Sequence, residues 1–172
     1  MKKALLLAGV ACILGVSQAQ AMTVDPYVGL DYVYSDMDMK HGADHQLENK
    51  FNSLSFNAGA KLHENFGVEA YYQQSDTEGK HGRDSRFYSY GVDAMGYLPV
   101  AQNIDLIGSL GIGQYEFRAG GDDNGLGYRV GVGAQYSFNN NWSARAMVRE
   151  VFLDEDVMDN MFEVAAGVRY NF

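Results

Sequence analysis

Apolar and polar residues alternate along most of the chain, from about residue 26 to the last residue. The final segment is the clearest example, because apolar side chains occupy every second position from Phe162 to Phe172. Residues 127–138 repeat this pattern, with small or polar residues at most of the intervening positions. A period of two places successive side chains on opposite faces of a β-strand. Both segments are therefore predicted to be strands with one apolar face.

The rest of the chain shows the same pattern, interrupted by clusters of Asn, Asp and Gly that are typical of turns. The eight predicted strands lie near 26–35, 52–63, 66–75, 86–97, 104–117, 127–138, 142–152 and 162–172. The connections between them alternate between short segments and mostly longer, charged segments. Bacterial outer-membrane barrels have short periplasmic turns and longer extracellular loops. The predicted fold class is all-β, an eight-stranded antiparallel up-and-down transmembrane β-barrel.

The same alternation would also fit a soluble barrel such as a lipocalin, whose apolar face points inward around a ligand. Two features favour the membrane barrel. The polar faces are rich in Gly, Ser, Gln and Asn and their charges nearly cancel, as an enclosed lumen requires. Aromatic residues gather toward the ends of the apolar faces, as in the two girdles of a transmembrane barrel. The expected girdles are Tyr27, Phe66, Tyr136, Phe138, Trp142, Tyr170 and Phe172 at one end, and Tyr34, Tyr72, Tyr88, Tyr128, Phe152 and Phe162 at the other.

The N-terminal residues predict export from the cytoplasm. Residues 1–3 carry two lysines, residues 4–16 form an apolar run, and residues 19–21 read Ala-x-Ala. These are the three parts of a secretory signal peptide, and a run of about 13 residues is too short to cross a bilayer as a helix. We expect 1–21 to be a cleaved signal peptide and 22–172 to form one barrel domain in the cell outer membrane.

Composition narrows the range of partners. The chain has 13 Lys and Arg against 22 Asp and Glu, a formal net charge of −9, whereas nucleic acids are bound by basic patches. The single cysteine, Cys12, lies within the predicted signal peptide, so the mature chain is expected to have no disulfide and no thiol nucleophile. The expected partners are outer-membrane lipids and lipopolysaccharide, with an unknown host or surface ligand as a further possibility and no nucleic acid.

Charged residues on the predicted inner face balance in sign and are expected to form a lumenal charge network. Its members are Asp31, Lys61, Glu69, Asp93, Arg129, Arg145, Arg149, Glu163 and Arg169, with Asp105 as a further acid. An isolated charge in a narrow lumen is costly, whereas a paired and hydrogen-bonded charge is tolerated. The lumen of an eight-stranded barrel is just wide enough for side chains to fill, so we expect a plugged interior.

The positions of these charges along the strands predict partners for them. Lys61 and Glu69 flank one short turn almost symmetrically and are expected to pair across it. Arg149 and Glu163 flank the 153–161 loop in the same way. Two further arginines, Arg145 and Arg169, are expected to form ion pairs with Asp31 and Asp93.

Several short motifs carry a resemblance to a known family. They are the N-terminal signal, Tyr-Val-Gly-Leu at 27–30, Asn-Phe-Gly-Val-Glu at 65–69 and the alternating end at 170–172. In these features the chain resembles the OmpA/OmpX-type barrels, which include the opacity-like surface antigens of Gram-negative bacteria. The resemblance implies that Val168, Tyr170 and Phe172 form an assembly signal for the barrel-assembly machinery. The chain differs from OmpA in ending at the barrel, and its loops are shorter than those of opacity adhesins.

Residue types suited to catalysis or metal binding fall mainly in the predicted loops. Some eight-stranded barrels modify lipid A with a His/Ser dyad and a carboxylate, but the nearest grouping, His81 with Asp84 and Ser85, is more typical of a solvated turn. The groupings that could hold a cation are His41 and His45 with Asp36 and Asp38, residues 122–124, and residues 154–159. The acidic segments do not match an EF-hand pattern, and loose bridging of these loops to lipopolysaccharide by divalent cations is left open. We therefore expect no catalytic residue, no cofactor and no metal site.

The predicted function is that of a non-enzymatic surface barrel, whose acidic loops support membrane integrity, surface interaction or adhesion. One alternative is a small low-conductance pore, and a second is a lipid A-modifying membrane enzyme. Loop-dependent binding, conductance in a planar bilayer and a change in lipid A mass distinguish these three functions.

Overall fold

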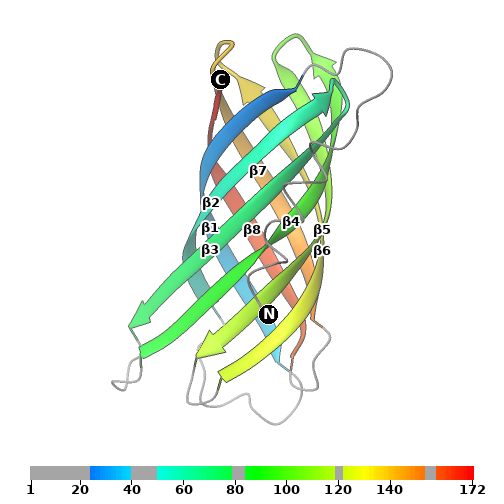
Figure 1. Cartoon of the computed structure of the whole chain (residues 1–172). Coiled ribbons are helices and arrows are strands. Elements are labelled where there is room, and N and C mark those ends of the chain that lie inside the picture. The colour runs from blue at the N-terminus through cyan, green and yellow to red at the C-terminus, as the bar shows by residue number, and fades with distance from the viewer. Residues whose placement is uncertain (1–23, 40–49, 79–83, 119–121, 154–157) are drawn as a thin grey trace.

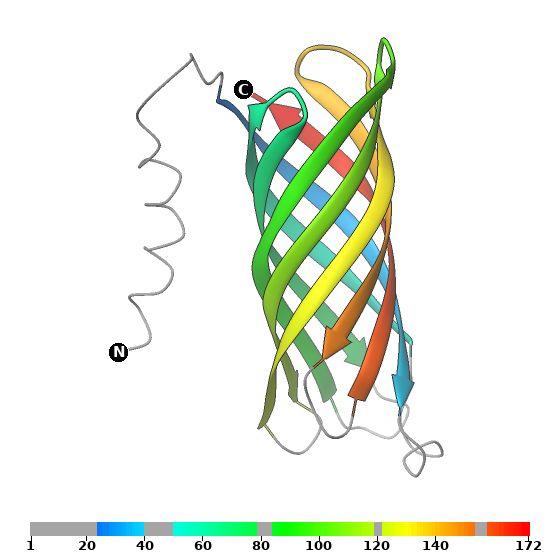
Figure 2. The same cartoon turned by 90° about the vertical axis from the view of Figure 1, so that its right-hand side faces the viewer.

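The computed structural model describes residues 24–39, 50–78, 84–118, 122–153 and 158–172, and the predicted signal peptide, 1–21, lies outside them. The strands are β1 (Asp25–Met39), β2 (Lys50–His63), β3 (Phe66–Glu78), β4 (Asp84–Ala101), β5 (Ile104–Arg118), β6 (Asp122–Ser137), β7 (Trp142–Leu153) and β8 (Met158–Asn171). Each strand pairs antiparallel with its neighbour along the chain, and β8 pairs with β1 to close the barrel. Figures 1 and 2 show the tilted strands winding around one tall barrel. The predicted fold class is confirmed.

Several strands are longer than the sequence pattern indicates. β4 begins at Asp84 rather than near 86, and β6 begins at Asp122 rather than near 127. In both places the hydrogen-bonded ladder continues through polar sequence, and Arg118 lies opposite Asp122 at the end of the β5–β6 pair. Apolar alternation ends where the wall leaves the bilayer, whereas backbone groups still gain from pairing beyond that point. Within the described ranges, no helix is long and apolar enough to cross a bilayer.

The connections at 64–65, 102–103 and 138–141 lie at the end of the barrel that holds the C-terminus (Figures 1 and 2). They join β2 to β3, β4 to β5, and β6 to β7. In the β6–β7 turn the Asn139 side-chain oxygen accepts hydrogen bonds from the backbone N–H groups of Asn141 (2.9 Å) and Trp142 (2.8 Å), as in other Asn-initiated turns. By the length rule for outer-membrane barrels, this end faces the periplasm and the opposite end faces the cell exterior.

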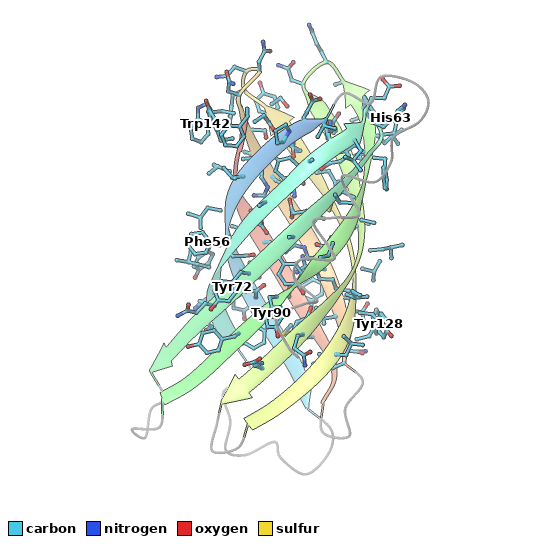
Figure 3. All side chains as sticks on the ribbon, viewed as in Figure 1. Phe56, His63, Tyr72, Tyr90, Tyr128 and Trp142 are labelled. Atoms are coloured by element: carbon cyan, nitrogen blue, oxygen red, sulfur yellow. The ribbon has the colours of Figure 1, made fainter. Side chains whose placement is uncertain are left out.

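Exposure alternates along every strand, and the exposed positions in the middle of the wall are apolar. Phe56, Leu110 and Val132 are exposed, Val132 to 60%, and Figure 3 shows Phe56 and Tyr128 projecting away from the wall. The intervening positions are buried and many are polar or charged. A lipocalin-type barrel would show the reverse distribution, so the outward apolar face supports a barrel surrounded by lipid.

Aromatic side chains form a contiguous group at the periplasmic end. The ring centroids of Trp142 and Tyr170 lie 5.1 Å apart, and those of Tyr170 and Phe172 lie 5.2 Å apart, both edge to face. Such contacts stabilise a girdle at a membrane interface. The prediction that Tyr27 belongs to this girdle is wrong, because its side chain is only 4% exposed. Tyr27 has the opposite parity to the outward Val28, so it points into the lumen.

We expect Val132→Arg to destabilise the barrel, because it places a charge on the lipid-facing wall. Arginine near the bilayer midplane should cost about 2–4 kcal/mol. The free energy of unfolding is measured by denaturant titration of the protein refolded into lipid vesicles. Asn140→Arg, in an exposed periplasmic turn, is the matched control and should have little effect. A neutral Val132→Arg would contradict the assigned inner and outer faces.

Candidate functional site

The inner wall of the barrel carries the densest group of charged residues in the described chain. The inward acids are Asp31, Glu69, Asp93, Asp105 and Glu163, and the inward bases are Lys61, Arg129, Arg145, Arg149 and Arg169. Five negative groups therefore face five positive groups. All are buried except Lys61 and Asp105, which are partly exposed.

A chain of alternating charges crosses the centre of the lumen. Arg145 Nη1 lies 2.7 Å from Glu69 Oε2, and Arg169 Nε lies 3.6 Å from the same oxygen. Arg169 then donates from Nη1 and Nη2 to the two Asp31 oxygens at 2.6 and 2.8 Å. Asn57 donates a further hydrogen bond to Asp31 at 3.1 Å. This chain links β7, β3, β8, β1 and β2 through side chains.

A separate ion pair, between Arg129 and Asp93, joins β6 to β4. Arg129 Nε donates to Asp93 Oδ1 at 2.7 Å, and Arg129 Nη2 contacts Asp93 Oδ2. The Arg129 guanidinium carbon lies 3.3 Å from the centroid of the Tyr71 ring. A two-pronged charge-assisted contact with an aromatic face behind it satisfies a buried guanidinium well. Tyr71 is held in turn by its hydroxyl, which donates to Tyr115 at 3.3 Å.

The ion pair between Lys61 and Asp105 lies near the periplasmic mouth and is more open to solvent. Lys61 Nζ is 3.1 Å from Asp105 Oδ2, and the two side chains are 27% and 18% exposed. Lys61 Nζ also lies 4.3 Å from the centroid of the Tyr97 ring. Pairs with this exposure contribute less than buried ones because water screens them.

Most of the expected partnerships are replaced by contacts across the lumen. Lys61 does not pair with Glu69; its partner is Asp105 on β5, and Glu69 takes Arg145 on β7. Asp93 pairs with Arg129 rather than with Arg145 or Arg169. The Asp31 partnership of Arg169 is the one that agrees with the prediction. Long side chains reach across the lumen to strands that are not neighbours. Symmetric positions about a turn therefore do not predict these contacts.

Arg149 and Glu163 lie directly opposite each other on β7 and β8 but do not form the expected ion pair. Arg149 Nη2 is 3.9 Å from Asp31 Oδ2, and its Nε and Nη1 have no hydrogen-bond partner. Glu163 Oε1 accepts from Gln73 at 3.1 Å, while Glu163 Oε2 has no partner. These two groups are the least satisfied charges in the described lumen.

Two apolar clusters share the lumen with the charges and were not predicted from the sequence. Toward the extracellular end lie Phe87, Tyr115, Val151 and Met161, with Leu153 packed against them. Toward the periplasmic end lie Met95, Tyr97, Ile107 and Met147. Each of these residues stands at an inward parity position, and that parity is the signal that could have revealed them.

Inward glycines make room for the charged side chains. A Cβ atom at Gly111 would collide with the Asp93 carboxylate, and one at Gly167 would collide with the Asp31 carboxylate. Because interiors are packed to near-crystalline density, the large charged side chains require small residues opposite them. The Gly-rich polar faces in the sequence therefore reflect a filled lumen.

The other candidate residues contribute little to the described site. No group of three or more His, Cys, Asp or Glu residues in the described part of the chain could hold a metal ion. His63 is exposed at the β2–β3 turn (Figure 3), where its Nδ1 accepts from the Asn65 N–H at 3.3 Å. The remaining candidates lie outside the described backbone or side chains: Asp38, His41, His45, His81, Asp84, Ser85, residues 122–124 and residues 154–159.

Three solved structures with the same architecture are distant from this chain in sequence. Neisserial surface protein A aligns with a TM-score of 0.68 and 21% identity, covering 86% of this chain and 97% of that chain. Ail, the attachment invasion locus protein of Yersinia pestis, aligns at 0.58 and 18%, covering 87% and 97%. The N-terminal β-barrel domain of OprF from Pseudomonas aeruginosa aligns at 0.61 and 14%, covering 85% and 97%. Identities this low establish a shared fold.

Sequence comparison assigns the family. No curated protein sequence matches the chain. The family model for the outer membrane protein beta-barrel domain matches residues 4–172, nearly the whole chain, in agreement with the closed barrel and its outward apolar face. The chain therefore belongs to the outer membrane protein beta-barrel domain family, as an outer-membrane barrel of the OmpA/OmpX-like type.

Proposed function

We propose that this protein is a non-enzymatic surface barrel whose filled lumen stiffens the wall, while its extracellular segments contact molecules outside the cell. The observation that carries this proposal is the filling of the lumen by large buried side chains. Those exposed to less than 2% are Arg149, Arg169, Tyr115, Phe87, Met95, Met161, Gln73, Glu69, Glu163, Val33 and Val151. A barrel interior occupied in this way leaves the outer surfaces to carry the function.

The pattern of contacts also argues against a pore. A passing ion would have to separate two-pronged pairs such as Arg129 with Asp93 and displace an apolar cluster in each half of the lumen. Breaking a buried pair leaves an uncompensated charge, which is strongly unfavourable. We therefore expect wild-type protein to show no large, stable conductance in a planar bilayer.

The extracellular segments are proposed to make the functional contacts, including contacts with lipopolysaccharide. The segment after β7 is the most acidic, with Asp154, Glu155 and Asp156 in succession. Two of the structural neighbours carry surface-related names, a surface protein of Neisseria and an attachment invasion locus protein of Yersinia pestis. These names support a surface role for barrels of this architecture.

A deletion strain complemented with defined variants tests this function. Wild type is compared with a loop variant that combines Asp154→Asn, Glu155→Gln and Asp156→Asn. We expect the loop variant to assemble normally, as judged by heat-dependent gel migration, and to lose whole-cell binding or resistance to envelope stress. Full complementation by the loop variant would contradict the role of this segment. Large conductance, or a change in lipid A mass that depends on the protein, would overturn the surface-barrel function itself.

The central pairs are expected to couple strongly in a double-mutant cycle. Asp93→Asn and Arg129→Met each leave a buried partner unsatisfied and should cost about 3–5 kcal/mol. The double variant should cost clearly less than the sum, because it removes both members together. Denaturant unfolding of protein refolded into vesicles measures all four corners of the cycle.

The partly exposed pair provides the matched control for this cycle. Asp105→Asn with Lys61→Met removes a lumenal ion pair in the same barrel, but one that water screens. Its coupling should be about 1 kcal/mol or less. Equal coupling in the two cycles would show that burial does not set the strength of these pairs.

The C-terminal residue is proposed to serve assembly by the barrel-assembly machinery. Phe172 is exposed directly after β8; its ring contacts Tyr170 on the outer face, and its backbone N–H donates to the Pro26 carbonyl oxygen at 3.1 Å. Deleting Phe172 should lower outer-membrane levels in cells while refolding into detergent stays largely intact, because few packing contacts are lost. Immunoblots of membrane fractions measure the first effect, and Val24→Ala, another exposed change at the same end, is the control. Normal cellular levels after the deletion would contradict this role.

A further inference from the structure

A carboxylate interrupts the apolar outer wall on β7. Glu150 is exposed on β7, and its register partners on the adjacent strands are Val130 and Phe162. The outward residues before and after it on β7 are Val148 and Phe152. All four neighbours are exposed apolar side chains, so Glu150 lies within the lipid-facing surface.

The depth of Glu150 follows from the strand register. Tyr128 and Phe152 form the next outward pair toward the extracellular end, and both are exposed aromatics of the kind that mark the membrane interface. Glu150 therefore lies one step inside the extracellular girdle, at the boundary between acyl chains and headgroups. An ionisable residue at such a position is a functional candidate whose partner has to be identified.

The described positions next to Glu150 offer no partner for its charge. The side chains of Arg129, Arg145, Arg149 and Arg169 and of Lys61 point into the lumen. The positions around Glu150 in the register, Val130, Val148, Phe152 and Phe162, carry no charge. The strand positions adjacent to Glu150 therefore supply no positive charge, and the lipid layer is what surrounds this exposed side chain.

We propose that Glu150 binds a divalent cation that it shares with a phosphate group of lipopolysaccharide. Mg²⁺ and Ca²⁺ prefer oxygen ligands, and Mg²⁺ is commonly held by one or two carboxylates together with phosphate oxygens and water. Because the extracellular leaflet places lipid phosphates at headgroup depth, one cation bridges two anions that would otherwise repel each other. This inference rests on the lipopolysaccharide contact of the proposed function.

The surroundings of Glu150 strengthen such a bridge. Phe152 and Phe162 flank the carboxylate along the strand and across it, and Val130 and Val148 cover the other sides. An apolar collar lowers the local dielectric constant, so attraction between the carboxylate and a cation exceeds that at a fully solvated site. A carboxylate in an extracellular loop would lack this collar.

Thermal stability in defined vesicles tests the proposal. Mature wild type, Glu150→Gln and Asp25→Asn are reconstituted in vesicles of lipopolysaccharide with phosphatidylcholine, and in phosphatidylcholine alone, with Mg²⁺ or with EDTA. Asp25 is an exposed carboxylate at the periplasmic end, so its variant controls for net charge. In lipopolysaccharide with Mg²⁺, Glu150→Gln should melt about 2–4 °C below wild type, as followed by heat-dependent gel migration. The difference should vanish with EDTA and in phosphatidylcholine, and Asp25→Asn should match wild type.

Each other outcome overturns the bridge in a different way. Equal melting of wild type and Glu150→Gln in lipopolysaccharide with Mg²⁺ removes any role for the carboxylate. A difference that persists with EDTA excludes the cation, and a Mg²⁺-dependent difference in phosphatidylcholine alone excludes the shared lipid phosphate. A difference found only in whole cells would indicate a basic partner protein. The loop variant tests the proposed surface function in a separate experiment. A negative result for the Glu150 bridge therefore does not decide the surface function.

Discussion

Closure of the barrel between β1 and β8 is the constraint on which the rest of the structure depends. Lipid offers no hydrogen bonds to a backbone, so an open sheet edge within the bilayer would leave a row of unpaired N–H and C=O groups. The β1–β8 ladder, from Tyr27 opposite Asn171 to Met39 opposite Met158, removes that edge. Once the ring is closed, every strand position must face either lipid or lumen.

Closure also creates an interior too narrow to be left polar and empty. Each lumenal charge meets an opposite charge or a hydrogen-bonding amide, and three of the pairs join strands that are not neighbours, as Glu69 on β3 and Arg145 on β7 do. The apolar clusters pack beside the buried pairs, and their low polarity strengthens the electrostatic attraction. The incompletely satisfied Arg149 and Glu163 show where this packing is least tight.

Strand parity was predictable from sequence because the bilayer imposes it on each strand separately. Val132 and Phe162 could be assigned to the outer face from local alternation alone, without knowledge of any neighbour. Tyr27 was wrongly assigned to the outer aromatic girdle because it is aromatic, although its position in the alternation places it on the lumenal face. The pairing of Glu69 with Arg145 could not be predicted, because it depends on how far side chains reach across the closed ring. Glu150 is a charged residue at an outward position where apolar residues are expected. Only the strand register shows that its neighbours are apolar.

The lumenal ion pairs join residues far apart in the chain. Asp31 and Arg169 are separated by 138 positions, and Glu69 and Arg145 by 76. Contacts of such long range form only after most of the chain has been ordered. A slip of one residue in any strand would turn its charged side chains toward lipid. The lumenal ion pairs consequently favour one strand register, because a barrel that closes in the wrong register cannot form them. This selection of a single strand alignment does not depend on any contact between a loop and a ligand.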